Sequence, residues 1–155
     1  MSREAIPTWF FVLVIVLQDD QFLLVQETKH GKTWYLPAGR VEPGELLTEA
    51  AERETLEESG LRVKIEGILR IDHTPLPDYT RVRVIFVASP IDDTPPKSRA
   101  DEHTLQAAWY TLPEVKPLAL RGIELIAMLE YVQAGATIYP LSLLSYETAP
   151  FKFRD

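Results

Sequence analysis

One segment, Leu46 to Ser59, restricts the fold of this 155-residue chain more than any other. It is rich in Ala, Glu and Leu and contains neither Gly nor Pro. Pro43-Gly44 precedes the segment and Gly60 follows it, a pattern typical of a helix that ends on a glycine C-cap. The sequence therefore predicts a helix over residues 46–59.

This helix carries acids on the face that should pack against the core. The apolar side chains of its first half form one stripe: Leu47, Ala50 and Ala51. At about 100° per residue, this stripe continues into Glu54 and Glu58, with Glu57 slightly to one side. If the face were solvated, which is the competing interpretation, the repulsion would cost little. At a partly buried site, two carboxylates about 5 Å apart repel by roughly 3 kcal/mol, and a hard divalent ion such as Mg²⁺ or Mn²⁺ removes this conflict.

Strand patterns surround the helix. Apolar or alternating runs predict strands at residues 8–17, 22–26, 34–36, 61–71, 81–88 and 106–111. A second helix is predicted over about residues 120–133, and residues 137–155 are expected to form a peripheral C-terminal segment. Strands interleaved with two helices predict a single α/β domain over residues 1–155, built around a mixed sheet.

Composition and charge argue against several other classes of protein. The chain has no cysteine, which excludes disulfides, thiolate catalysis and thiolate metal sites. Its longest apolar run, Trp9 to Leu17, has the length of a strand and is too short to cross a bilayer. The net charge of −7 argues against nucleic-acid binding, which needs clustered cations. With no signal peptide recognisable, we expect a cytoplasmic protein without a membrane or nucleic-acid partner.

Seven residues between Gly39 and Leu61 have the identity and spacing of the Nudix box. Gly39 is followed after five residues by Glu45 and, after seven more, by Arg53-Glu54-Thr55-Leu56-Glu57-Glu58-Ser59-Gly60-Leu61. With each fixed residue at about 6% usage, a chance match at one start position is on the order of a few in a billion. Two positions depart from the usual pattern: Thr55 replaces an aliphatic residue, although its methyl group can still pack, and Ala38 replaces a second glycine. The chain therefore resembles the Nudix hydrolases, the MutT-type family.

This resemblance implies a fold, a cofactor and a reaction. The fold is an α/β/α sandwich around a mixed sheet, and the cofactor is Mg²⁺, with Mn²⁺ as a substitute. By resemblance, Glu54, Glu57 and Glu58 bind the metal together with the backbone carbonyl of Gly39. Arg53 would orient a carboxylate. The substrate would be a small nucleotide: a nucleoside di- or triphosphate, or a nucleoside diphosphate linked to another moiety, in which water attacks a phosphorus atom.

The resemblance does not fix the catalytic base. Glu102, which follows a loop and precedes the strand predicted at residues 106–111, is the first candidate outside the box. A solvated acid beside Asp101 is the competing interpretation. Glu57 could also serve as the base while touching the metal. We expect Glu45 to have a structural role, in which it caps or supports the loop before the helix.

Substrate binding requires further cations and aromatic rings. Arg40, inside the box, is the best-placed cation for the phosphates. Four weaker candidates, for which an exposed surface position is the competing interpretation, are Lys29, Lys32, Arg81 and Arg83. Three aromatic residues could stack on a base, although aromatic residues in strands are usually core residues: Trp34, Tyr35 and Phe10. We assign no role to His73 or His103, which lack a metal-binding pattern.

Other functions of the same scaffold, and the identity of the substrate, stay open at this point. One alternative is a non-catalytic Nudix-fold module that binds a nucleotide as a sensor, although such modules usually lose glutamates of the box. An isomerase would need further acid, base or cysteine residues. Pro77 and Tyr79 match the patterns of two different substrate groups, so neither discriminates. Oxidised nucleotides and ADP-ribose-like conjugates are both candidate substrates, and homodimerisation also stays open.

Overall fold

The first strand organises the fold of residues 3–153, the part of the chain that the computed structural model describes. β1 (Thr8–Gln18) pairs in parallel with β6 (Thr80–Pro90) along most of its length. It also pairs antiparallel with β4 (Ala38–Arg40) and, at its C-terminal end, with β2 (Gln21–Glu27). Its β-branched and aromatic residues suit a strand with a neighbour on each side.

The remaining strands extend the sheet on both sides of β1. β5 (Val63–Pro75) forms an antiparallel hairpin with β6. β3 (Trp34–Tyr35) and β7 (Thr104–Thr111) both pair antiparallel with β2. Within residues 3–153 the sheet has seven strands, and the β1–β6 pair is parallel whereas the others are antiparallel. The mixed sheet predicted from the sequence is therefore confirmed.

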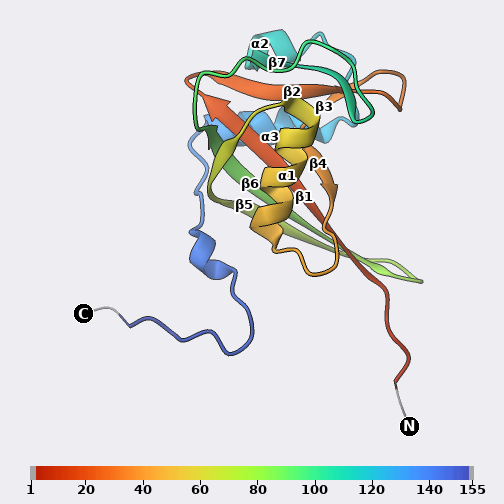
Figure 1. The fold of residues 1–155 in the computed structure, drawn as a ribbon, viewed down its shortest axis with the longest axis vertical. Coiled ribbons are helices and arrows are strands. Elements are labelled where there is room, and N and C mark those ends of the chain that lie inside the picture. Colours follow the sequence, from red (N-terminus) through yellow and green to blue (C-terminus); the bar gives the residue numbers. More distant parts are fainter. Residues whose placement is uncertain (1–2, 154–155) are drawn as a thin grey trace.

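Helices cover both faces of this sheet, and Figure 1 shows α1 in front of it and α3 behind. α1 (Leu47–Ser59) packs on one face and α3 (Glu124–Gln133) on the other. Alternate residues of a strand point to opposite faces, so Val14 of β1 lies in the α1 cluster and Ile15 in the α3 cluster. The predicted α/β/α sandwich is confirmed.

Tertiary pairing shifts the ends of several predicted elements. The strand predicted at residues 61–71 runs from Val63 to Pro75, because its last residues pair with β6 in the hairpin. The second helix was expected from about residue 120 but begins at Glu124. Leu120 instead forms a β-bridge with Trp34, which takes it out of the helix. Local patterns indicate the type of an element better than its ends.

Short elements account for what the sequence patterns did not predict. β4 and the one-turn helix α2 (Leu112–Val115) are too short to show a period. In the C-terminal segment, Ile68 and Tyr139 exchange two backbone hydrogen bonds of 2.8 Å, and a 3₁₀ turn, η1 (Leu141–Leu143), follows. The segment then extends away from the sheet (Figure 1). No helix in the described residues is long and apolar enough to cross a membrane.

Candidate active site

The glutamates of α1 lie at the border of its buried face. The residues that are 0% exposed are Ala50 and Ala51, followed by Thr55 and Ser59. Glu54 and Glu58 follow Ala50 by four and eight residues, as predicted. Thr55 and Ser59 were not predicted to belong to this stripe. Thr55 and Ser59 can be buried because their hydroxyl groups donate hydrogen bonds to backbone carbonyls four residues earlier. Glu54 and Glu58 are partly buried beside the stripe.

Glu58 is bound at the first residue of β4. The backbone N–H of Ala38 donates a 2.7 Å hydrogen bond to its Oε1. Burial nevertheless raises the pKa of Glu58 to about 8, because the Ala38 hydrogen bond only partly offsets the loss of solvent and Glu54 adds repulsion. Burial also raises the pKa of Glu54, against the opposing effect of Arg53. Both carboxylates therefore lie where a further positive charge would stabilise them.

Gly39 lies directly against the Glu54 carboxylate. A Cβ atom at this position would collide with the carboxylate atoms of Glu54. Gly39 is not among the glycines with a positive φ. It is therefore required for space rather than for backbone conformation, and it brings the β4 backbone into contact with a predicted metal ligand.

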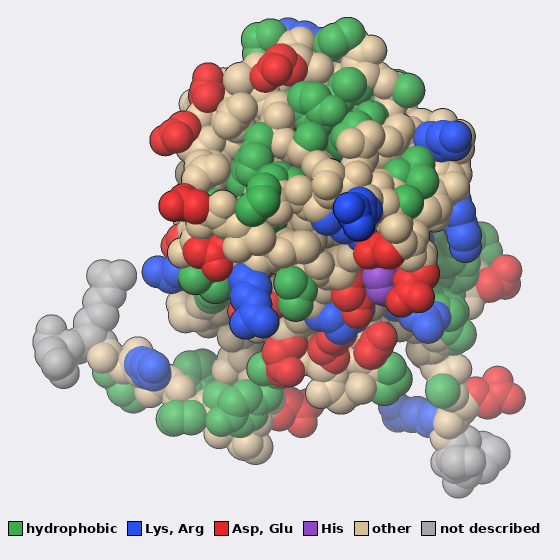
Figure 2. Space-filling model, turned by 45° about the horizontal axis from the view of Figure 1, so that its top comes forward, with side chains coloured by type: hydrophobic (Ala, Val, Ile, Leu, Met, Phe, Trp, Pro, Cys, Tyr) green, Lys and Arg blue, Asp and Glu red, His purple; other side chains and the backbone are tan. Residues whose placement is uncertain are grey.

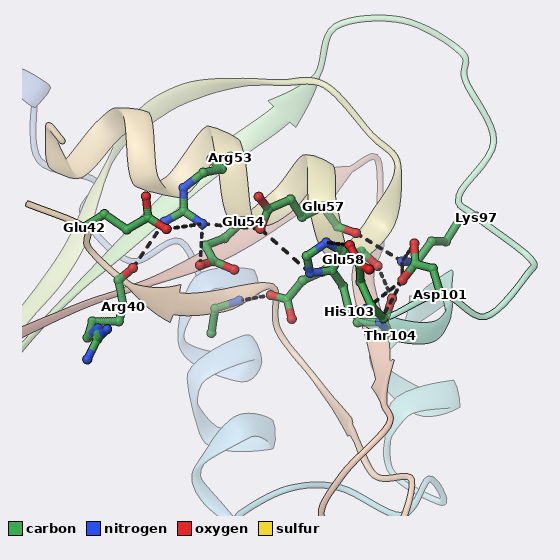
Figure 3. Close-up of polar contacts among 12 residues, drawn as sticks. Arg40, Glu42, Arg53, Glu54, Glu57, Glu58, Lys97, Asp101, His103 and Thr104 are labelled. Carbon is green, nitrogen blue, oxygen red and sulfur yellow. Dashed lines mark hydrogen bonds and ion pairs between the residues drawn. The ribbon is translucent and has the colours of Figure 1, made fainter.

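Arg53 holds the acids of the site together, as Figure 3 shows. Its Nε and Nη2 atoms donate to the two carboxylate oxygens of Glu45 at 2.7 and 3.0 Å. Its Nη1 donates to Glu54 at 2.8 Å and to Glu57 at 3.3 Å. Nη2 also donates to the carbonyl oxygen of Arg40 at 3.2 Å. Arg53 thus binds two of the predicted metal ligands and fixes the loop that precedes the helix.

Glu45 has the supporting contacts that we expected of it. Besides the two bonds from Arg53, its Oε1 accepts a 3.0 Å bond from the backbone N–H of Glu42. The Arg53 hydrogen bond lowers the pKa of Glu45, so this carboxylate stays ionised as the partner of the guanidinium. Glu45 therefore links the loop to the helix through Arg53.

The loop before β7 is attached to the C-terminal end of α1. Lys97 donates from Nζ to the carbonyl oxygen of Glu57 at 3.1 Å and to Asp101 at 2.7 Å. Thr104 donates from Oγ1 to the carbonyl oxygen of Glu58 at 2.6 Å. These donors satisfy carbonyl groups that the last turn of a helix leaves without partners. The attachment fixes the position of the residues between Asp101 and Thr104.

Those residues, Glu102 and His103, lie beside the glutamates of α1. His103 Nδ1 is 4.0 Å from Glu57 Oε2, and His103 Nε2 is 3.3 Å from Glu102 Oε1. The Glu102 side chain is 85% exposed, so it can reach a molecule bound above the site. The structure thus brings Glu102 to the predicted metal ligands, and it places His103, to which we assigned no role, at the same point.

A cavity of about 270 Å³ lies over these carboxylates, and its lining residues are Glu27, Thr28, Lys29, His30, Glu54, Glu58, Glu102, His103 and Arg121. Figure 2 shows acidic and basic side chains gathered around a histidine on one face of the molecule. Sequence reasoning missed Glu27, His30 and Arg121, because they come from segments far from the box and no spacing connects them to it. Below, this space is called the acidic cavity.

The donors at the acidic cavity suit a hard divalent ion. Within residues 3–153, no three Asp, Glu or His side chains are close enough to hold an ion in their present rotamers. Arg53 donates hydrogen bonds to Glu54 and Glu57, and the Ala38 N–H donates one to Glu58. Carboxylate oxygens are the donors that Mg²⁺ prefers, and the raised pKa values of Glu54 and Glu58 indicate the same need for positive charge.

Two residues predicted to bind substrate lie apart from these carboxylates. The Arg40 side chain points away from them (Figure 3) and stacks over the Trp9 ring at 4.9 Å. It lines a separate cavity of about 590 Å³. Trp34 is 7% exposed and packs edge-on against Tyr110 at a centroid distance of 5.1 Å. Its packing supports the core position rather than stacking on a base.

Arg83 borders a third, smaller cavity next to Gly39. It is not the isolated surface charge of the competing interpretation, because its guanidinium pairs with Asp72 at 2.7 Å and with Glu124 at 2.9 Å. The cavity measures about 180 Å³, and its lining residues are Phe11, Val12, Leu13, Tyr35, Ala38, Gly39, Arg81, Arg83 and Arg121. Because Tyr35 and Phe11 are its aromatic residues, this space is called the aromatic cavity below.

Comparison with known proteins points to one family. The family model described as NUDIX domain matches residues 10–129. The human protein named 8-oxo-dGDP phosphatase NUDT18 is 39% identical over 125 residues, which are 78% of this chain and 38% of that protein. The protein named phosphatase NudJ from Shigella boydii is 30% identical over 142 residues, which are 90% of this chain and 92% of that protein. The chain therefore spans well under half of NUDT18 but nearly all of NudJ.

Solved structures give the same result. A structure described as a NUDIX hydrolase from Nitrosomonas europaea has a TM-score of 0.76 and 31% identity. The match covers 90% of this chain and 97% of that one. This solved structure thus shares the fold that carries the site.

Proposed function

The chain belongs to the NUDIX family, and from this premise we propose that it hydrolyses a phosphoanhydride bond of a nucleotide derivative at the acidic cavity with a divalent metal ion. The observation that carries the proposal is the position of Glu54 and Glu58. Both line the cavity, both are partly buried, and burial raises the pKa of each. Acids in such a position can bind a cation, and the cation can in turn bind a phosphate group.

The metal ion would be Mg²⁺, with Mn²⁺ as a substitute, and its ligands would be Glu54, Glu57, Glu58 and the carbonyl oxygen of Gly39. When bound, such an ion neutralises phosphate charge and activates water. Arg53 is the positioning residue for Glu54 and Glu57, to which it donates at 2.8 and 3.3 Å. Of these two carboxylates, Glu54 lines the acidic cavity, and Glu57 lies 4.0 Å from His103, which also lines it.

Glu102 is the proposed general base. Its exposed side chain lines the acidic cavity and lies 3.3 Å from the His103 ring. A carboxylate that is neither fixed by Arg53 nor buried is free to accept a proton from water. Glu57 is the second candidate, but its hydrogen bond with Arg53 favours a role as a metal ligand.

The proposed substrates are nucleoside di- or triphosphates, or nucleoside diphosphates linked to another group. The names of two relatives, 8-oxo-dGDP phosphatase NUDT18 and phosphatase NudJ, support phosphate release from a nucleotide. In this reaction water attacks one phosphorus atom and the P–O–P bridge breaks. The bridging oxygen leaves with the other phosphate group.

A panel of nucleotides tests this proposal. Nucleoside di- and triphosphates, their oxidised forms and ADP-ribose should be incubated with Mg²⁺, with Mn²⁺ and with EDTA, and the products separated by chromatography. We expect cleavage of at least one member with either metal and none with EDTA. Tight nucleotide binding without any turnover would instead support a binding module, and turnover in EDTA would contradict the role of the metal.

A further inference from the structure

Arg121 lies at the junction of the acidic and aromatic cavities. It is the one described residue that lines both of them. Glu54 and Glu58 border only the acidic cavity, and Tyr35 borders only the aromatic one. A ligand that occupies both cavities therefore has to pass the Arg121 side chain.

The Arg121 guanidinium is held on two sides. It stacks on the Tyr35 ring at 5.2 Å, and its Nη1 donates to Glu27 Oε1 at 2.9 Å. The Arg121 backbone N–H donates to the Trp34 carbonyl oxygen at 3.1 Å, which fixes the loop that carries it. Of the five N–H donors of a guanidinium, only one has a hydrogen-bond partner within the described residues. The side chain is still 48% exposed, so free donors face a ligand.

A phosphate group can bind in the acidic cavity only beside a cation such as the Arg121 guanidinium, because acidic side chains line this cavity. Four carboxylates line it: Glu27, Glu54, Glu58 and Glu102. A phosphate approaching them is repelled unless cations are present. Arg121 is the lining cation fixed by both an aromatic ring and an ion pair. Its planar N–H groups match two phosphate oxygens at once.

The aromatic cavity suits the remainder of a nucleotide. Its volume of about 180 Å³ is below the roughly 300–1,000 Å³ of sites that enclose a whole ligand, so it holds only one part. Phe11 is half-buried and has the Arg81 guanidinium over its ring at 4.7 Å. Tyr35 is 7% exposed, and the Arg121 guanidinium covers its ring at 5.2 Å. A half-buried ring such as Phe11, and planar guanidinium groups such as those of Arg81 and Arg121, can stack with a flat heterocycle.

We propose that Arg121 binds the phosphate attached to the nucleoside, so that the base lies in the aromatic cavity and the outer phosphate lies over the carboxylates. Glu27 is the positioning residue, because it holds the guanidinium toward the junction. This inference rests on the proposed function.

Binding of reaction products tests the inference without turnover. The four common nucleoside monophosphates and their nucleosides are titrated into the protein in EDTA by calorimetry. The variants are Arg121→Gln, Arg121→Lys and the control Arg99→Gln, which changes an exposed arginine that lines neither cavity. Losing a charged hydrogen-bond partner costs about 1.5–3 kcal/mol, so Arg121→Gln should weaken binding of the best monophosphate by about 10- to 100-fold. The affinity of Arg121→Gln for the matching nucleoside should not change. Arg121→Lys should bind the monophosphate less weakly than Arg121→Gln does, and Arg99→Gln should bind it with wild-type affinity.

The inference is overturned if no monophosphate binds to wild type, or if Arg121→Gln binds the monophosphate as tightly as wild type does. It is also overturned if Arg121→Gln weakens binding of the nucleoside as much as binding of the monophosphate. If the pattern appears but no nucleotide is hydrolysed, Arg121 keeps its role and the proposed function fails. If nucleotides are hydrolysed and Arg121→Gln has an unchanged KM, the proposed function stands and this inference fails.

Discussion

The metal-free protein should lose stability as pH rises, because ionised Glu58 is unfavourable in the fold. Burial raises the pKa of Glu58 from 4.5 to about 8. The folded state therefore holds the proton more tightly than the unfolded chain does. The stability from this proton is complete below about pH 4.5 and is lost as pH rises toward about 8. Glu58→Gln removes the charge and retains an oxygen acceptor for the Ala38 N–H.

The size of the effect follows from the same pKa. At pH values between the pKa of Glu58 in the unfolded chain and its pKa in the folded protein, each pH unit changes the free energy of unfolding by at most about 1.36 kcal/mol. Over the interval from 4.5 to about 8, the loss for wild type is at most about 5 kcal/mol. The advantage of Glu58→Gln over wild type should therefore be small near pH 4.5 and reach up to about 5 kcal/mol near pH 8.

Urea unfolding in EDTA across this pH interval measures the difference. Glu52→Gln is the matched control, because Glu52 lies on the same helix but is exposed. It should follow wild type at every pH. Added Mg²⁺ should stabilise wild type near pH 8 more than Glu58→Gln, since a bound ion removes the same conflict. A stability difference that is independent of pH, or a Glu58→Gln protein less stable than wild type near pH 8, would refute the reasoning.

Two glycines should respond differently to the same substitution. Gly39→Ala should change the free energy of unfolding by less than about 1 kcal/mol, because the new methyl group meets the flexible end of the Glu54 side chain. The metal-dependent turnover of this variant should fall about 10- to 100-fold, because the Glu54 carboxylate has to move. Gly67→Ala should cost about 1–3 kcal/mol, because its Cβ would come within 2.5 Å of Ile138 and 2.7 Å of the Tyr139 carbonyl oxygen. Urea midpoints and turnover rates check both, and equal responses of the two variants would contradict these contacts.

Local sequence signals were sufficient for α1 and its ends. Gly60 adopts the left-handed conformation, with φ of 79°, and its N–H donates to the Leu56 carbonyl oxygen, as the glycine C-cap predicted. The helical wheel also placed Glu54 and Glu58 on the side of Ala50 and Ala51, where the structure has them partly buried. It did not show that Thr55 and Ser59 continue the buried stripe, because a wheel does not count the hydrogen bonds that let hydroxyl groups be buried.

The rest of the candidate site depends on tertiary structure. The box residues are close in sequence, so their spacing revealed them. Glu27 and Arg121 are 94 positions apart, and only the pairing of β2 with β3 and the bridge between Trp34 and Leu120 bring them together. The same bridge contributes to the burial of Trp34, which the sequence could not separate from a stacking residue.

Turnover of a nucleoside diphosphate at saturating Mg²⁺, by wild type, Glu57→Gln and Glu52→Gln, tests the central claim most directly. Glu57 faces the site, whereas Glu52 is an exposed acid of the same helix. We predict that Glu57→Gln lowers the rate by at least about 100-fold, a barrier increase of about 2.7 kcal/mol, and that Glu52→Gln keeps the wild-type rate. Unchanged turnover in Glu57→Gln would contradict the assignment of the α1 glutamates as metal ligands.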